Sequence, residues 1–154
     1  MDQYSKNVIS EELIFLDNDF KSQQEIISFL VEKANNAGYV SDNEELYEAV
    51  QKREKEVSTA IGYLIAIPHG KTEAVIHPFI GFIRTKDELK WSEDSEEKVR
   101  LIFLIGVPEK AEGKLHLKFI SQLSKKLLDD NFREQLLTKA DSQEIFNQLN
   151  DIEI

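Results

Sequence analysis

Apolar residues follow two different spacings along the chain, and each spacing predicts a different kind of element. Short segments rich in Ile, Leu, Phe and Val are typical of buried strands, and they occur at residues 9–17, 63–67, 74–84 and 99–107. Elsewhere apolar residues recur every three or four positions, as on a helix with one buried face, at residues 22–38, 42–55, 115–128, 131–137 and 142–149. Strands interleaved with helices predict an α/β fold in which helices pack on a sheet.

Local capping signals support two of these helices. Ser22-Gln-Gln-Glu25 is a capping box, in which the serine side chain accepts an amide hydrogen bond from the first turn of the helix. Asp42-Asn-Glu-Glu45 has the same form and opens the second helix. Gly38 is placed to end the first helix, because glycine readily adopts the left-handed backbone found just beyond a helix.

The apolar run from Tyr63 to Ile67 leads into a single histidine between proline and glycine, Pro68-His69-Gly70. Proline cannot donate a ladder hydrogen bond and glycine permits unusual backbone angles, so we expect the strand to end here. Residues 57–62 are interpreted as a loop leading into it. His69 is then expected at the carboxyl end of a strand, where ligands usually meet an α/β sheet.

Length and composition predict one soluble domain. A chain of 154 residues with 41% hydrophobic residues can bury a real core, and no repeat or linker divides it. Residues 86–98 are polar and acidic except for Leu89 and Trp91, which predicts a loop or a short edge strand. The N-terminus lacks the pattern of a signal peptide, and no apolar run approaches the roughly 20 residues of a membrane span. We therefore expect a cytoplasmic protein.

Charge and cysteine usage narrow the classes of function. A formal net charge of −10 makes nucleic acid an unfavourable partner and favours partners that carry a basic patch. The chain contains no cysteine, which excludes disulfides and thiol chemistry and fits a reducing compartment.

The chain has three histidines, His69, His77 and His116. They are 8 and 39 residues apart and no cysteine accompanies them, so the spacing does not favour a zinc site, and we expect no metal. His77 precedes a proline at the start of a predicted strand and is interpreted as structural. His69 remains the histidine whose local sequence best suits contact with another molecule, because imidazole can act as a base or a nucleophile near neutral pH.

His116 shares the apolar stripe of its helix with Ile120, Leu123 and Leu127. It lies in the first turn, so a side chain on the inward face would look toward the strand ends where His69 is expected. The positive end of the helix dipole there would favour a neutral imidazole or a nearby anion. The alternative is a core histidine bonded to a carbonyl, and the sequence leaves both interpretations open.

Arg53 is three residues from Val50 and seven from Leu46, and this spacing predicts that it continues the buried stripe of its helix into the last turn. One interpretation is a guanidinium aimed at an oxyanion, with the hydroxyls of Ser58 and Thr59 as further donors. The other is a long side chain whose charge reaches solvent at the negative end of the helix dipole.

Taken together, these motifs resemble one known family, the enzyme IIA domains of the bacterial phosphoenolpyruvate-dependent sugar phosphotransferase system, in their type 2 (fructose/mannitol) form. The resemblance covers residues 9–150, leaves 1–8 as an N-terminal extension, and is carried by Arg53-Glu54, Ser58-Thr59-Ala-Ile-Gly62, Ile65-Ala-Ile-Pro-His69-Gly70, Pro78-Phe-Ile-Gly-Phe82, residues 99–108 and Leu115-His-Leu-Lys118. Tyr63-Leu64 departs from it, since the family often has a glycine there, which bears on local packing more than on chemistry.

The resemblance implies a mixed β-sheet sandwiched between helices in a single domain, and a phosphocarrier function. His69 would accept a phosphoryl group from phospho-HPr and pass it to a cysteine of a IIB component, with a IIC membrane permease involved indirectly. Arg53 would hold the phosphoryl oxygens, with Ser58 and Thr59 as further phosphate donors, and His116 would lie close to His69. An acidic surface around this site would steer a basic HPr, and no cofactor is required.

Two rival functions remain open. Nitrogen-type relatives of this family resemble it in sequence but regulate partner proteins through their phosphorylation state. A domain that binds an anion without turnover is a third and weaker hypothesis. The sequence does not name the sugar, because enzyme IIA does not contact it.

Overall fold

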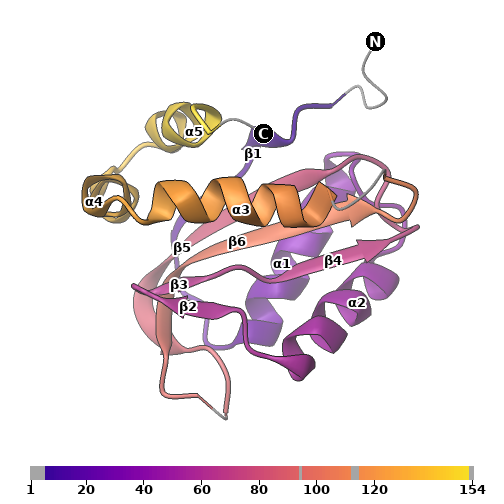
Figure 1. The fold of residues 1–154 in the computed structure, drawn as a ribbon, viewed down its shortest axis with the longest axis horizontal. Coiled ribbons are helices and arrows are strands. Elements are labelled where there is room, and N and C mark those ends of the chain that lie inside the picture. The colour runs from indigo at the N-terminus through magenta and orange to yellow at the C-terminus, as the bar shows by residue number, and fades with distance from the viewer. Residues whose placement is uncertain (1–5, 94, 112–114, 153–154) are drawn as a thin grey trace.

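The computed structural model describes residues 6–93, 95–111 and 115–152. Within these ranges the chain forms a six-stranded mixed sheet between two layers of helices (Figure 1). Residues 1–5 of the predicted N-terminal extension, and Asp94 of the predicted 86–98 segment, lie outside the described residues. The architecture is the sandwiched mixed sheet that the sequence predicts. No helix in the described ranges is both long and apolar enough to cross a membrane.

The sheet is built around one long antiparallel pair. Strands β5 (Phe79–Lys90) and β6 (Lys98–Pro108) form this pair, and β1 (Ile9–Asn18) runs parallel to β5 on its outer side. Two short strands, β3 (Ile65–Ala66) and β4 (His69–Thr72), lie one after the other along the free edge of β6 and are both parallel to it. Finally, β2 (Ala60–Gly62) pairs with β3 in an antiparallel hairpin.

Helices cover both faces of the sheet. One face carries α1 (Gln23–Asn36) and α2 (Asn43–Glu56), and the other carries α3 (Leu115–Leu127), α4 (Asp130–Thr138) and α5 (Ser142–Asn150). The predicted caps are present, since Ser22 and Asp42 each accept the amide of the third residue that follows, at 3.1 Å. All five predicted helices are therefore confirmed within the described residues.

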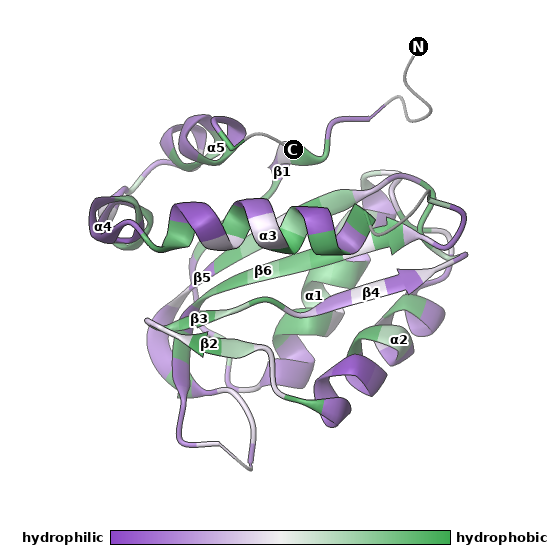
Figure 2. Cartoon of the chain, viewed as in Figure 1, coloured by the Kyte–Doolittle hydropathy of each residue, from purple (hydrophilic) through white to green (hydrophobic). Residues whose placement is uncertain are grey.

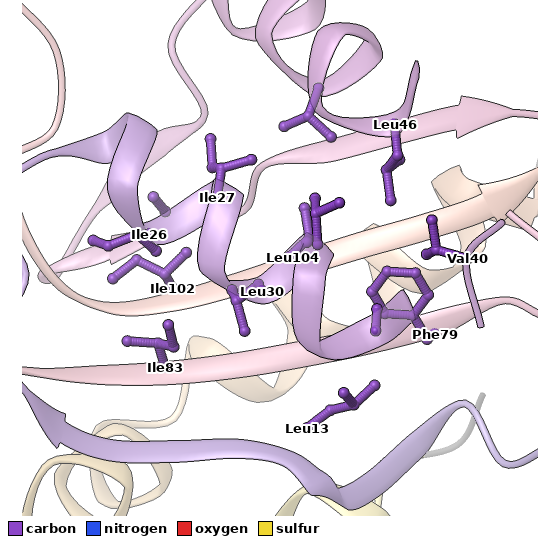
Figure 3. Close-up of a cluster of buried hydrophobic side chains, with 14 of the residues drawn as sticks. Leu13, Ile26, Ile27, Leu30, Val40, Leu46, Phe79, Ile83, Ile102 and Leu104 are labelled. Atoms are coloured by element: carbon purple, nitrogen blue, oxygen red, sulfur yellow. The ribbon is translucent and has the colours of Figure 1, made fainter. Parts of the chain in front are cut away.

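Each face of the sheet has its own hydrophobic cluster. Alternate residues of β6 belong to different clusters: Ile102 and Leu104 pack under α1 and α2, whereas Leu101, Phe103 and Ile105 pack under α3 to α5. Figure 3 shows the first cluster, in which side chains of α1 and α2 meet those of the sheet. Because β6 is covered on both faces, it is apolar along nearly its whole length (Figure 2).

Two predicted strands are wrong in their bounds. The run Tyr63 to Ile67 is not a strand throughout: Tyr63 and Leu64 form a turn with φ of 56° and 66°, and the residues before them, predicted as a loop, form β2. Residues other than glycine rarely adopt this left-handed backbone, so the turn must be stabilised by contacts with other parts of the chain. The Arg133 guanidinium lies 3.9 Å from the Tyr63 ring centre, and the Leu64 carbonyl accepts the amides of Arg100 and Leu101.

The other wrong bounds belong to the run at 74–84. Strand β5 begins only at Phe79 and continues to Lys90, so the predicted polar segment at 86–98 is partly strand. Ala74 and Val75 are buried in a turn instead, where the Ala74 amide donates to the carboxylate of Glu45 on α2. Their apolar character reflects burial beneath a helix and not membership of a strand.

Candidate functional site

His69 opens a strand and does not end one, which corrects the sequence prediction. Strand β3 stops at Ala66, and pairing with β6 resumes with His69 opposite Ile105. Pro68 cannot donate to the ladder, but its carbonyl accepts the amide of Ile105 at 3.0 Å. Ile67 and Pro68 therefore interrupt the strand just before His69, but the chain stays hydrogen-bonded to β6 through the Pro68 carbonyl.

Gly70 allows α2 to approach the strand that carries His69. A Cβ atom at this position would lie 3.0 Å from a Val50 methyl group and 3.2 Å from one of Leu46, closer than ordinary contacts. Because glycine has no side chain, α2 packs directly against β4. This contact brings the last turn of α2, including Arg53, beside His69.

The imidazole of His69 has a defined tautomer. Its Nδ1 lies 3.0 Å from the carbonyl oxygen of Ile67, and because a carbonyl oxygen can only accept, Nδ1 carries the proton and donates. Nε2 is therefore left with its lone pair, which is the form required of a nucleophile.

Burial and charge keep this imidazole neutral. Burial lowers the pKa of His69 below its usual value, and the positive charge of Arg53 lowers it further. The Ile67 carbonyl and the negative charge of Glu54 act in the opposite direction but do not outweigh burial. His69 is half-buried, so it combines a neutral ring with access from solvent.

The five residues singled out from the sequence come together in one pocket, with a volume of about 670 Å³. We call this the His69 pocket, and it is lined by Ala49, Lys52, Arg53, Glu56, Ser58, Thr59, Ile61, Ile67, His69, Gly70, Lys71, His116, Leu117, Ile120 and Ser124. Lys52, Arg53 and Lys71 give its wall more positive than negative charge, in a chain whose net charge is −10. Such a wall favours an anion.

His116 lies beside His69 on the pocket wall. The two rings are nearly parallel, with an interplanar angle of 26° and 6.3 Å between their centres. His116 is half-buried in the first turn of α3, so the structure places it where the functional interpretation requires. His77 is not part of the pocket lining, and its ring contacts Tyr39 edge-on.

The buried stripe of α2 continues through Glu54 and not through Arg53. Its buried residues are Leu46, Val50 and Glu54, spaced four apart, whereas Arg53 is half-buried at the edge of the stripe. Arg53 donates to the carbonyl of Val57 at 2.9 Å, which holds it across the end of its own helix. The prediction that Arg53 continues the stripe is therefore wrong by one position.

Glu54 is the residue that sequence reasoning missed. Its carboxylate accepts hydrogen bonds from the amide and the hydroxyl of Thr59, so that hydroxyl is engaged and does not point at the pocket as a donor. Ser58 differs, because its hydroxyl oxygen accepts the Ala60 amide and its own hydrogen is not used in that bond. The spacing of Glu54 from Leu46 and Val50, read at i+4 and i+8, is the signal that could have found it.

The described residues contain no group of three or more His, Cys, Asp or Glu side chains placed to hold a metal ion. The site combines a neutral imidazole, which can act as a nucleophile, with a neighbouring guanidinium. The imidazole is accessible to solvent, and the pocket wall around it is positively charged. This arrangement can accept and release an anionic group at His69.

The family model described as "Phosphoenolpyruvate-dependent sugar phosphotransferase system, EIIA 2" matches residues 7–152. The chain belongs to this family. A type 2 enzyme IIA is a phosphotransferase component of the sugar phosphotransferase system, so the predicted family is confirmed.

Two relatives illustrate how this enzyme IIA domain occurs. It is 34% identical over 141 residues to the fructose-specific EIIA component of Haloferax volcanii, covering 92% of this chain and 91% of that one. It is also 34% identical to the fructose-specific EIIABC component of Bacillus subtilis, but there 93% of this chain spans only 22% of the relative. The domain is thus similar both to a protein of its own size and to one part of a larger protein.

Solved structures share the fold of this enzyme IIA domain. The nitrogen regulatory protein IIA-Ntr of Neisseria meningitidis superposes with a TM-score of 0.81 at 29% identity, over 92% of this chain and 96% of that one. The mannitol enzyme IIA of Escherichia coli, in complex with phosphorylated enzyme IIB, gives a TM-score of 0.77 at 27% identity, over 92% and 96%. The predicted mannitol/fructose-type fold is therefore confirmed.

Proposed function

We propose that this enzyme IIA domain is a phosphocarrier in sugar uptake, which accepts a phosphoryl group from phospho-HPr on His69 and passes it to a cysteine of a IIB component. The observation that carries the proposal is the state of His69. Its Nδ1 is committed to the Ile67 carbonyl, and the lone pair of Nε2 is available in a pocket that contains a guanidinium. We assign Nε2 as the phosphorylated atom.

Neither transfer consumes a reactant beyond its donor and its acceptor. The Nε2 lone pair attacks phosphorus while the bond from phosphorus to the donor nitrogen breaks, and that electron pair stays on the donor imidazole. Nδ1 keeps its proton, so the phosphorylated ring carries a positive charge that the Ile67 carbonyl stabilises. In the second step a cysteine thiolate of IIB attacks the same phosphorus, and the electron pair of the broken bond returns to Nε2.

The cations of the His69 pocket stabilise charge on the phosphoryl oxygens. Arg53 is the main donor, because its guanidinium is already held beside the ring, and the hydroxyl hydrogen of Ser58 is a second. Thr59 contributes to phosphate binding only if its hydroxyl leaves Glu54. His116 faces His69 and approaches the transferred group from the side of α3.

The rim of the pocket suits two successive protein partners. Val57, Ile61 and Leu117 are 67%, 47% and 45% exposed, and the last two line the pocket, so apolar area surrounds the reacting ring. We propose that HPr and IIB dock here in turn, as the complex of the mannitol relative with its IIB suggests. A cytoplasmic location fits the absence of cysteine, and neither nucleic acid nor membrane insertion is involved.

One observation favours a second function. The nitrogen regulatory protein superposes on this chain at least as well as the mannitol enzyme does. The second function is regulation: His69 would still be phosphorylated, but the phosphorylated domain would bind and control another protein. Transfer of the phosphoryl group to IIB separates the two: rapid transfer supports the carrier, and its absence, with tight binding to a regulated partner, supports the regulator.

The test is a reconstituted relay with purified phosphoenolpyruvate, enzyme I, HPr and a IIB component. We expect the wild-type chain to acquire an acid-labile phosphoryl group on Nε2 of His69, detected by NMR, and to lose it when IIB is added. His69→Gln should acquire none, whereas His77→Gln, changed outside the pocket, should be labelled normally. Normal labelling of His69→Gln would contradict the proposal.

A further inference from the structure

Glu54 is a buried acid that the proposed chemistry does not use. It follows Arg53 in α2 but does not line the His69 pocket, and only 8% of it is exposed. Its carboxylate accepts three hydrogen bonds, from the amide of Thr59 at 3.1 Å, from the hydroxyl of Thr59, and from the indole of Trp91 at 3.2 Å. A carboxylate held by three donors is fixed in place.

These bonds continue to His69 through the main chain. The Thr59 carbonyl accepts the amide of Ile67 at 3.1 Å, and the carbonyl of Ile67 accepts the Nδ1 proton of His69 at 3.0 Å. The Ile67 carbonyl therefore sets the tautomer of His69, and Thr59 sets the position of Ile67. Glu54 in turn holds Thr59 by both its amide and its hydroxyl.

Trp91 anchors the other side of Glu54. This side chain, which lies just after β5, is 1% exposed, and its main-chain carbonyl accepts the side-chain amide of Gln23 at the start of α1. Glu54 thus joins α2, the Thr59 segment and the β5–β6 connection at one point. Leucine would fill the same space, so the three acceptor bonds, and not bulk, distinguish an acid here.

We infer that Glu54 is a positioning residue for phosphoryl transfer: through Thr59 and Ile67 it holds His69 as the Nδ1–H tautomer with Nε2 toward the pocket. The inference rests on the proposed function, because it concerns the same nucleophile. It does not make Glu54 a catalytic residue, since the carboxylate contacts neither the phosphoryl group nor the ring. The negative charge of Glu54 also acts on the pKa of His69, which it raises.

The test compares Glu54→Gln with Glu48→Gln, an acid-to-amide change on the exposed face of the same helix. Glutamine keeps the length of the side chain but presents an NH₂ group to donors. We expect the phosphorylation rate of Glu54→Gln to fall by roughly 10- to 100-fold, as when a reacting group is displaced by about 1 Å. Glu48→Gln should react at the wild-type rate.

A second measurement excludes a merely structural role. The ¹⁵N shifts of the His69 ring report its tautomer in the unphosphorylated protein; we expect nearly pure Nδ1–H in wild type and a mixture in Glu54→Gln. Thr59→Val, which loses the hydroxyl, should also give a mixture, and Thr59→Ser should restore the wild-type tautomer. If Glu54→Gln does not fold, the tautomers of Thr59→Val, Thr59→Ser and Trp91→Phe decide whether Glu54 positions His69. Trp91→Phe removes the indole donor to Glu54.

The outcomes separate this inference from the proposed function. A folded Glu54→Gln protein with the wild-type tautomer and the wild-type rate would overturn the positioning role alone. A wild-type protein that phospho-HPr does not label would overturn the proposed function, and the tautomer measurement would still decide the role of Glu54. Loss of rate with an unchanged tautomer would also count against the positioning role.

Discussion

Two arginines in this molecule have opposite surroundings. Arg84, on β5, is 3% exposed, and within the described residues it donates four hydrogen bonds, two to the Asp17 carboxylate and one each to the carbonyls of Leu136 and Lys139. Arg53, on α2, is half-buried, and within the same residues it donates one, to the carbonyl of Val57.

The difference shows how the same side chain serves structure in one place and chemistry in another. Arg84 has four of its five N–H donors occupied by the protein, and through Leu136 and Lys139 it ties the end of α4 to the sheet. Arg53 is oriented by one bond and keeps other donors for a ligand, beside an imidazole whose pKa its charge lowers. A guanidinium with unused donors at a pocket indicates an anion site more strongly than burial does.

Replacing Arg53 with methionine should have the largest effect on phosphoryl transfer. Methionine keeps the apolar stem and removes the charge, so we expect Arg53→Met to lower the phosphorylation rate by about 10²–10³, as when one donor to a developing anion is lost. The free energy of unfolding should change by less than about 1 kcal/mol, since Arg53 is not in the core. Rates with phospho-HPr and denaturant melts measure both.

The same substitution at Arg84 should have the reverse profile. Arg84→Met leaves the carbonyls of Leu136 and Lys139 without this donor, which should destabilise the protein by about 2–4 kcal/mol. The phosphorylation rate per folded molecule should stay within about twofold of wild type, because Arg84 bonds no residue of the His69 pocket. If both variants lose rate and stability together, the two regions are not distinct and the comparison fails.

Replacing His116, the other histidine of the His69 pocket, should have a smaller effect on phosphoryl transfer. His116 lies beside His69 but does not hold its tautomer, so we expect His116→Gln to be phosphorylated about tenfold more slowly, a smaller loss than the roughly 10²–10⁴ of a group that transfers a proton in the reaction. The Nδ1–H tautomer of His69 should be unchanged. A loss as large as that of Arg53→Met would show that His116 carries more of the transferred charge than the geometry suggests.

Much of the fold could be predicted because its signals are local. Ser22 and Asp42 mark the starts of their helices through bonds to residues three positions away, and the β6 segment is apolar along nearly its whole length. The prediction is wrong where apolar residues are held by distant contacts. Tyr63 and Leu64 occupy a left-handed turn, and their partners, Arg133 and β6, are far along the chain.

The sequence predicts the residues of the site better than it predicts the residues that hold them in position. The flanking proline and glycine point to His69, and helical spacing points to Arg53 and His116; the structure brings the three together, although their roles stay predictions. Glu54 was missed because an acid on a buried stripe is identified only by its partners. One of them, Trp91, is 37 residues away, and no periodicity in the sequence joins the two.

The pH dependence of His69 sharpens the comparison in a different way. Burial and Arg53 lower the pKa of His69 below its usual 6.5, so the midpoint of its titration should lie below that pH. We expect an NMR titration of His69 to show this. Arg53→Met should move the midpoint upward because a neighbouring positive charge is gone, and Arg84→Met should not move it. An unchanged midpoint in Arg53→Met would mean that the charge of Arg53 does not act on this pKa.

The smallest expected effect is the loss of stability at low pH that comes from Asp17, the carboxylate partner of Arg84. The bonds from Arg84 lower the pKa of Asp17 below its usual 3.8, so the folded state binds this proton less readily than the unfolded chain does. The resulting stability is present above pH 3.8 and is lost as the pH falls through the folded-state pKa. Because Asp17 is about half exposed, with 54% of its side chain accessible, the contribution should be less than about 1 kcal/mol. Asp17→Asn should therefore be slightly less stable than wild type near neutral pH, and the gap should close in acid. Denaturant melts across this range, with Asp87→Asn as an exposed control on β5, the strand of Arg84, measure it. A gap that stays constant with pH would assign the effect of Asp17 to its shape and hydrogen bonds and not to its charge.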